Sequence, residues 1–330
     1  MIKGPTAYWG LPIALAALVL AFQLPSCGGG GGTVTAPAGV TRGTITGFGS
    51  VFVNGVEYFT DNDTLRFHVD DGPSDISGLD NDVFRVGMVV EVHHGADDTD
   101  ATRIEFANNL EGPVAGLAGN GFSVLGISVV TDGATNIQRD GGATLADGAI
   151  AEVSGLPDSS GVLHATFIEV KPAATVTAFE VKGYVVANNL GVDNSFTLGM
   201  VPNAGAAAKI QVDGATVFDT AGGRAGLAAG SFVEVRTASA SAPILATAVE
   251  AQGSETESPD GANASIEGYP TNIYAAPKTF TLMGIGVDAA GAVVYEHPMA
   301  GFAEITGATK VEVHGTMSGG KLLASRIGPR

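Results

Sequence analysis

The sequence predicts an all-β protein: a tandem array of four small five-stranded β-barrels behind a signal peptide and a glycine-rich tether. Three observations predict this organisation. A Val-Glu-Val pattern occurs four times, with Ala151 in place of the first valine in the second copy, glycine is abundant with 48 residues, and an apolar N-terminal segment ends at the only cysteine of the chain. Abundant glycine with few long helix formers favours strands joined by many turns.

The repeated pattern is centred on four glutamates. In an extended chain the flanking valines point to one face and the glutamate to the other. We therefore expect four half-buried strands, with valine in a core and glutamate facing out. The glutamates recur roughly every 60 to 80 residues, too long a period for the common solenoids, which favours small independent domains in series. They are Glu91, Glu152, Glu234 and Glu312.

Each copy of the pattern lies in a segment with four further short apolar stretches. Five short strands can close into a small barrel, which removes unpaired strand edges. In the first segment Asn54-Gly55 lies between apolar residues, a strong signal for a tight hairpin. Barrels this small have little core each, so neighbours are expected to pack against one another. We define the first to fourth repeats as residues 41–107, 108–172, 178–252 and 264–330.

The N-terminal segment has the parts of an export signal. Lys3 is the only charge before an apolar run from Leu11 to Leu24, and Cys27 follows closely. The run is short for a membrane-spanning helix, which needs roughly 20 apolar residues. Cys27 is placed as in the lipobox of bacterial lipoproteins, a resemblance that makes 1–26 a signal peptide and Cys27 the acylated N-terminus. The alternatives are an uncleaved anchor or an ordinary signal with a chance cysteine.

Residues 27–40 follow as a glycine-rich tether, which cannot bury a core and behaves as a flexible leash. Acyl chains on Cys27 would hold a folded body close to a membrane. By the same resemblance, Gly28 after the cysteine permits sorting to the outer membrane. The expected location is therefore the cell envelope, on either the periplasmic or the surface face of the outer membrane.

A family resemblance follows from the order of motifs within each repeat. A glycine-led first strand precedes a Phe-x-Val/Leu-x-Gly turn, a threonine, Gly-x-x-x-Glu-Val and a closing Ile/Val-Glu; the first repeat shows it in Gly43, Gly87, Glu91 and Ile104-Glu105. This order resembles the domain of unknown function called DUF5666, over roughly residues 41–330. The resemblance implies small OB-like barrels in an exported lipoprotein. It implies no activity, because the family has none assigned.

Charge restricts the class of partner. With 16 Lys and Arg against 34 Asp and Glu, the formal net charge is −18. Such a surface repels phosphate backbones, so a nucleic-acid partner is not expected. With one cysteine there is no disulfide within the chain, and burial must stabilise the fold.

Acidic loops and histidines are the candidate metal sites of the sequence. Asp97, Asp98 and Asp100 offer the oxygens that Ca²⁺ prefers, but they lack the spacing of an EF-hand, and a solvated charged loop is the plainer interpretation. His93 and His94 leave a strand on opposite faces, so they cannot chelate one metal together without a bulge. No cofactor is therefore expected, with calcium as the open possibility.

Aromatic residues are the signal for a carbohydrate ligand. Tyr184 and Tyr269 follow the opening glycine of the third and fourth repeats, and Tyr274 is near in sequence. Their rings are candidates to stack on a sugar, although half-buried strand positions explain them as well. The only tryptophan, Trp9, lies in the segment expected to be removed.

No catalytic motif appears. Gly-x-Ser-x-Gly, Gly-x-Gly-x-x-Gly and the P-loop pattern are all absent. The sequence thus favours a non-enzymatic, lipid-anchored envelope protein that binds or organises an unidentified envelope protein or glycan. A carbohydrate- or exopolysaccharide-binding module is the first alternative. A secreted hydrolase with a site between domains is the second.

Overall fold

The computed structural model describes residues 39–60, 65–69, 76–77, 83–95, 99–172, 176, 178–202, 207–252 and 259–330. These residues contain strands and short 3₁₀ turns, without an α-helix. The chain divides into residues 1–35 and 36–330, and every described residue belongs to the second unit. No helix among the described residues has the length and apolarity needed to cross a bilayer. The predicted signal peptide, Cys27 and most of the tether lie outside the described residues.

The first repeat begins with the nine-residue strand β1 and contains the predicted tight hairpin. The Asn54-Gly55 hairpin is confirmed: both residues have positive φ, 54° and 74°, and the flanking Val53 and Val56 pair across the turn. The strands are β1 (Gly39–Gly47), β2 (Val51–Val53), β3 (Val56–Tyr58), β4 (Arg66–Val69), β5 (Ile76–Ser77), β6 (Val89–His94) and β7 (Ala101–Phe106).

The second repeat follows the same plan. Its hairpin between β9 and β10 turns at Leu125 and Gly126, with φ of 48° and 80°. Its strands are β8 (Leu110–Ala118), β9 (Gly121–Val124), β10 (Ile127–Val130), β11 (Asn136–Arg139), β12 (Ile150–Pro157) and β13 (Leu163–Lys171).

The third and fourth repeats complete the fold. The third comprises β14 (Phe179–Asn189), β15 (Ser195–Gly199), β16 (Ala207–Gln211), β17 (Val217–Asp219), β18 (Phe232–Thr237), β19 (Ile244–Leu245) and β20 (Ala248–Ala251). The fourth comprises β21 (Asn263–Gly268), β22 (Thr271–Tyr274), β23 (Thr279–Leu282), β24 (Ile285–Asp288), β25 (Val294–Tyr295), β26 (Val311–Ser318) and β27 (Lys321–Pro329).

The four repeated segments, three Val-Glu-Val and one Ala151-Glu152-Val153, are confirmed as strands β6, β12, β18 and β26. The glycine that precedes the first three has a turn conformation that side chains rarely adopt. Gly87, Gly148 and Gly230 have φ of 97°, 84° and 89°. A glycine at this place therefore lets the chain turn sharply into the strand, which explains why the same residue returns.

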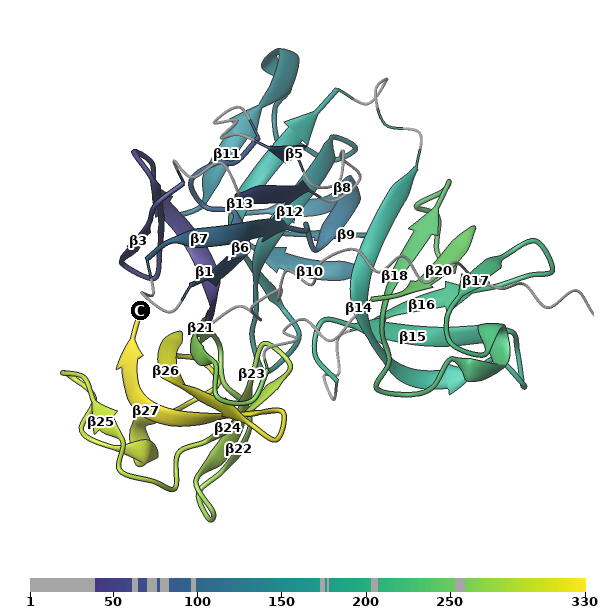
Figure 1. The fold of residues 1–330 in the computed structure, drawn as a ribbon. Coiled ribbons are helices and arrows are strands. Elements are labelled where there is room, and N and C mark those ends of the chain that lie inside the picture. The colour runs from purple at the N-terminus through teal and green to yellow at the C-terminus, as the bar shows by residue number, and fades with distance from the viewer. Residues whose placement is uncertain are drawn as a thin grey trace, which may run out of the picture. The chain divides into compact units, whose positions relative to one another are not determined.

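The prediction of four separate OB-like barrels is wrong. The strands form a β-solenoid of about 7 turns with mixed sheets. Two sheets, of 14 and 13 strands, continue across the boundaries between repeats. β1 pairs in parallel with β21, and these strands lie side by side although more than half the chain separates them (Figure 1). Likewise β8 pairs with β14. An edge left open by each small repeat is therefore paired with another repeat instead of being closed on itself.

The hydrophobic core also crosses repeat boundaries, which confirms the expected packing of neighbours. One cluster joins the second and third repeats, from Leu110 to Val249. Phe167 of the second repeat is buried in the cluster of the first, and Leu156 in that of the fourth. The Val89 amide donates a buried hydrogen bond of 3.0 Å to Ser154 Oγ. Small repeats thus gain from their neighbours the burial that none supplies alone.

The outward orientation predicted for the repeated glutamates is wrong for three of the four. Glu152, Glu234 and Glu312 are 9%, 1% and 0% exposed. The face opposite the valines is covered by a neighbouring element, so both faces of these strands are buried. A buried carboxylate requires a partner. Lys171 pairs with Glu152, Lys182 and Arg236 with Glu234, and Arg330 with Glu312.

Candidate functional site

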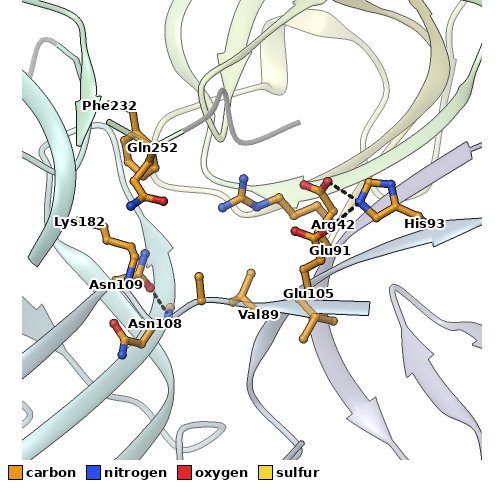
Figure 2. A pocket seen from close by; sticks show the side chains of 13 residues that line it. Arg42, Val89, Glu91, His93, Glu105, Asn108, Asn109, Lys182, Phe232 and Gln252 are labelled. Carbon is orange, nitrogen blue, oxygen red and sulfur yellow. Dashed lines mark hydrogen bonds and ion pairs between the residues drawn. The ribbon is translucent and has the colours of Figure 1, made fainter. Parts of the chain in front are cut away.

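A cavity of about 440 Å³ opens where the first three repeats meet. Strands β1 and β6 form one side, the 107–109 connection forms the floor, and β14 and β18 supply the other side (Figure 2). The boundary predicted between the first and second repeats, at residues 107 and 108, thus lies in the lining of this cavity. Its lining comprises Arg42, Val89, Val90, Glu91, His93, Glu105, Ala107, Asn108, Asn109, Gly155, Lys182, Phe232 and Gln252.

Strand register assembles the charged side of the cavity. Arg42 of β1 pairs with Glu91 of β6, and Glu91 pairs with Glu105 of β7, so the three side chains share one face of the sheet. His93 follows two residues after Glu91 and therefore lies on the same face. Its Nε2 is 3.1 Å from Glu91 Oε1 and 3.4 Å from Glu105 Oε1 (Figure 2).

The histidine carries a proton at neutral pH. Burial alone would lower the pKa of His93, but its contacts with Glu105 and Glu91 outweigh burial and raise the pKa to about 9. Contact with His93 in turn lowers the pKa of Glu105 against the opposing effect of burial, and Arg103 lowers it further. This side of the cavity is therefore an ionised cluster with an imidazolium between two carboxylates.

The opposite side combines a buried cation, an amide and a ring. Lys182 is 5% exposed, and its Nζ lies 3.4 Å from both Glu180 Oε1 and Glu234 Oε2. Gln252 Nε2 donates a 3.1 Å hydrogen bond to Glu234 Oε2. Phe232 packs on Tyr184 with ring centroids 4.9 Å apart. These contacts hold Lys182, Gln252 and Phe232 in place at the cavity wall.

Two asparagines on the floor have different roles. Asn109 Oδ1 accepts a 2.8 Å hydrogen bond from the Gly155 amide, and the Asn109 carbonyl accepts one of 2.9 Å from the Lys182 amide. Asn109 therefore ties the second and third repeats together. Asn108 is 5% exposed, and its Oδ1 has no hydrogen-bond partner among the described residues. A buried acceptor without a partner is costly, so Asn108 Oδ1 is placed to receive a donor from a ligand.

The arrangement suits recognition by hydrogen bonds. A fixed cation, two amides, an ionised cluster and one aromatic ring converge on a space large enough for a small polar ligand. Within the described lining there is no serine, threonine or cysteine side chain to serve as a nucleophile.

The structure places the predicted tyrosines elsewhere. Tyr184 and Tyr269 line a second cavity of only about 20 Å³, room for a water rather than a sugar ring. Tyr269 also stacks on His164 at a centroid distance of 4.5 Å. Tyr274 lies on β22 and is 59% exposed, outside the lining of both cavities.

The candidate metal ligands are only partly described. Asp97 and Asp98 lie outside the described residues, and Asp100 is exposed on the surface. Among the described side chains no group of three or more His, Cys, Asp or Glu forms a metal site. The prediction that His93 and His94 leave opposite faces is confirmed, because His93 lines the large cavity and His94 lines a groove on the other side.

Sequence reasoning missed most of the cavity. Lys182, Phe232, Gln252 and Asn108 are single residues in four different segments, and no local motif links them. One signal was present in the sequence: the Ala107-Asn108-Asn109 seam joins two repeats, and polar residues at such a seam indicate a junction that another element covers.

Comparison with known families agrees with the repeat analysis. The model of the family described as "Domain of unknown function (DUF5666)" matches residues 32–105, 111–169 and 180–250, which are the first three repeats. No curated protein matches the chain. The matched segments cover more than half of the sequence, so the chain belongs to the DUF5666 family.

Proposed function

We propose that this protein is a non-enzymatic binding protein of the cell envelope, and that it holds its ligand in the cavity between β1, β6, β14 and β18. The observation that carries the proposal is the buried, unpartnered Oδ1 of Asn108 on the floor of a 440 Å³ cavity. Lys182 and Gln252, both held by Glu234, supply fixed donors beside that acceptor. Such pre-ordered polar groups favour binding because little side-chain entropy is lost.

The favoured ligand is a neutral sugar unit of an envelope or extracellular glycan. Sugar hydroxyls both donate and accept, which matches a lining that offers the Asn108 acceptor and the Gln252 amide. Phe232 adds the apolar ring on which a sugar face can stack. The charges on the His93 side compensate one another, so they favour a polar ligand over a strongly charged one.

A hydrolase is less well supported by the same cavity. Glu91 and Glu105 both contact one nitrogen of His93, whereas glycoside hydrolysis needs two carboxyl groups that face the substrate. A general acid also needs a raised pKa, and the pKa of Glu105 is lowered. We therefore assign the cluster to electrostatic support of the cavity wall.

We further propose that Cys27 carries acyl chains and that the body is held at the outer membrane by the tether. The support is the sequence alone: an apolar run that ends at a lone cysteine, followed by glycine. In cells that make the full chain, Cys27→Ser should move the protein from the membrane fraction to the soluble fraction. Retention of the variant in the membrane fraction would refute the anchor.

The ligand is tested by binding of the full chain, in detergent, to an array of envelope and extracellular glycans. Hits are then measured by calorimetry with three variants. Asn108→Ala and Phe232→Ala should each weaken binding about tenfold or more, since each removes a direct contact. The matched control is Phe48→Ala, because Phe48 is 37% exposed and lies outside the cavity.

Two outcomes would overturn parts of this proposal. Binding to no glycan removes the carbohydrate ligand and leaves an envelope protein as the partner to be recovered from native membranes. Glycan binding that survives both cavity variants moves the site away from this cavity.

A further inference from the structure

A second groove, of about 390 Å³, lies where the first and fourth repeats join. The parallel pairing of β1 with β21 continues into β26 and β27, and strand register sets one residue of each strand in a row. Thr41 pairs with Ser265, Ser265 with His314, and His314 with Arg326. Residues in register share one face of a sheet. All four of these residues line the groove.

The groove and the large cavity use opposite faces of the same two strands. On β1, Arg42 lines the cavity and Thr41 lines the groove. On β6, His93 lines the cavity and His94 lines the groove. Successive side chains of a strand point to opposite faces, so the two spaces are separate sites.

The polar lining of the groove differs in charge from the rest of the protein. The formal net charge of the chain is −18, yet no acidic residue is among the described residues that line this groove. Arg326 supplies a guanidinium whose side chain is 47% exposed, and its Nε lies 3.2 Å from Glu296. Thr316 and Asn263 contribute a hydroxyl and an amide. One cation with neutral donors and no lining carboxylate favours an anion.

The acidic residue beneath the groove is already compensated. Glu312 is fully buried, pairs with Arg330 and accepts a 2.7 Å hydrogen bond from Ser265 Oγ. His314 Nε2 lies 2.8 Å from the same carboxylate. Burial, aided by the positive charge of Arg326, still lowers the pKa of His314 to about 4, although Glu296 opposes the shift. The imidazole of His314 is therefore neutral at pH 7 while the groove is empty, so it does not itself attract an anion. Its pKa rises when an anion is bound beside it.

We propose that this groove is an oxyanion-binding site in which Arg326 is the anchoring cation and Thr316 and Asn263 are supporting donors. The ligand class is a carboxylate, phosphate or sulfate group. An anion beside Arg326 and His314 offsets the positive charge of Arg326, which together with burial keeps the imidazole neutral, so binding is coupled to protonation of His314. The proposal is independent of the sugar ligand assigned to the cavity.

The test follows the histidine resonances of the full chain by NMR, with histidine labelling, at constant ionic strength in chloride. Sulfate, inorganic phosphate, acetate and galacturonate are titrated separately. Binding predicts a saturable shift of the His314 resonance with a Kd on the order of 1–10 mM for a small anion. Its pKa should rise by about one unit in the saturated state. A response to acetate and galacturonate alone assigns a carboxylate, and a response to sulfate and phosphate alone assigns the tetrahedral anions.

Matched variants decide whether the response belongs to the groove. Arg326→Gln should abolish the saturable shift, whereas Arg326→Lys should retain part of it. The control is Arg103→Gln, because Arg103 pairs with His93 in the first repeat as Arg326 pairs with His314 in the fourth. The proposal is overturned if no anion gives a saturable shift of His314, or if the shift persists unchanged in Arg326→Gln.

Discussion

Two copies of the same four residues, in the first and fourth repeats, place a histidine in opposite electrostatic surroundings. Val90-Glu91-Val92-His93 lies on β6, and Val311-Glu312-Val313-His314 lies on β26. In both, an arginine occupies the cross-strand position opposite the histidine. Local sequence is therefore matched, yet the pKa of His93 is raised to about 9 and that of His314 is lowered to about 4.

The difference arises on the neighbouring strand. On the strand that follows in each repeat, Glu105 of β7 stands opposite Glu91, whereas Gly328 of β27 stands opposite Glu312. His93 therefore contacts two carboxylates. On the other side, Arg42 of β1 is opposite Glu91, and Glu267 of β21, which pairs with Lys310, is opposite Glu312. Among the described residues, one carboxylate lies within ion-pair distance of His314, that of Glu312, which also contacts Arg330 and Ser265. The motif thus sets where the histidine lies, whereas burial and the charged groups on neighbouring strands decide whether it carries a proton.

The largest expected effect distinguishes the two glutamates. Glu312→Gln should lower the free energy of unfolding by about 3 kcal/mol, because the fully buried carboxylate loses its charge-assisted contacts with Arg330 and Ser265. Glu91→Gln should cost only about 1 kcal/mol, since Glu105 still pairs with His93. Urea unfolding of the full chain measures both. Equal losses of unfolding free energy in the two variants would contradict the claim that the more deeply buried glutamate contributes more to stability.

The second prediction concerns alkaline pH. The folded pKa of His93 lies above its unfolded value of about 6.5, so its stabilisation is complete below pH 6.5 and is lost as the pH rises through about 9. About 2–3 kcal/mol should disappear over this window. Urea unfolding at several pH values measures this loss. In His93→Gln, the free energy of unfolding should no longer fall with pH over this window. Glu105→Gln serves as the intermediate case, with the window moved to lower pH.

The positions of the strands that carry the repeated glutamates could be predicted from the sequence, but the residues that cover those strands could not. Alternation of valine with glutamate correctly located β6, β12, β18 and β26. The same alternation predicts that each strand has an apolar and a polar face, but it does not predict that another element covers the polar face. The buried carboxylate of Glu312 pairs with Arg330, 18 residues later in the same repeat, and no period in the sequence links the two.

The joining of repeats into shared sheets could not be predicted either. Parallel pairing of Thr41 with Ser265 connects segments more than 200 residues apart, and neither segment has a local signal for its partner. The turns were different, because Asn54-Gly55 specifies its conformation within two residues. Of the candidate tyrosines, Tyr184 is a half-buried strand residue, Tyr269 is half-buried just after β21, and Tyr274 is exposed on β22. The cavity combines Asn108, Lys182 and Gln252 only through long-range packing.

The third prediction mirrors the second at acid pH. The folded pKa of His314 lies below its unfolded value, so only the unfolded chain binds this proton between about pH 6.5 and 4. Stability should therefore fall as the pH falls through this window, by about 1–2 kcal/mol once solvent screening is allowed for. His314→Gln should flatten the slope. If the acid slope is unchanged in the variant, another group causes it.

The smallest expected change in stability comes from replacing the two arginines that lie opposite the histidines. Both are partly exposed, so Arg103→Gln and Arg326→Gln should each change the free energy of unfolding by less than about 1 kcal/mol. Their effects on the histidines should nevertheless differ. The positive charge of Arg326 helps to keep His314 neutral, so its removal should raise the pKa of His314 by up to about one unit. Arg103 pairs with Glu105 at 2.6 Å, and the two carboxylates dominate over it at His93.

In Arg103→Gln, the pKa of His93 should therefore stay near 9. Histidine NMR titration of both variants in the full chain measures the two shifts in one experiment. If the pKa of His93 changes more than that of His314, the arginines cause the difference in pKa between the two histidines, and the residue opposite each glutamate does not. The expected order instead follows from Glu105, which supplies in the first repeat the negative charge that Gly328 cannot supply in the fourth.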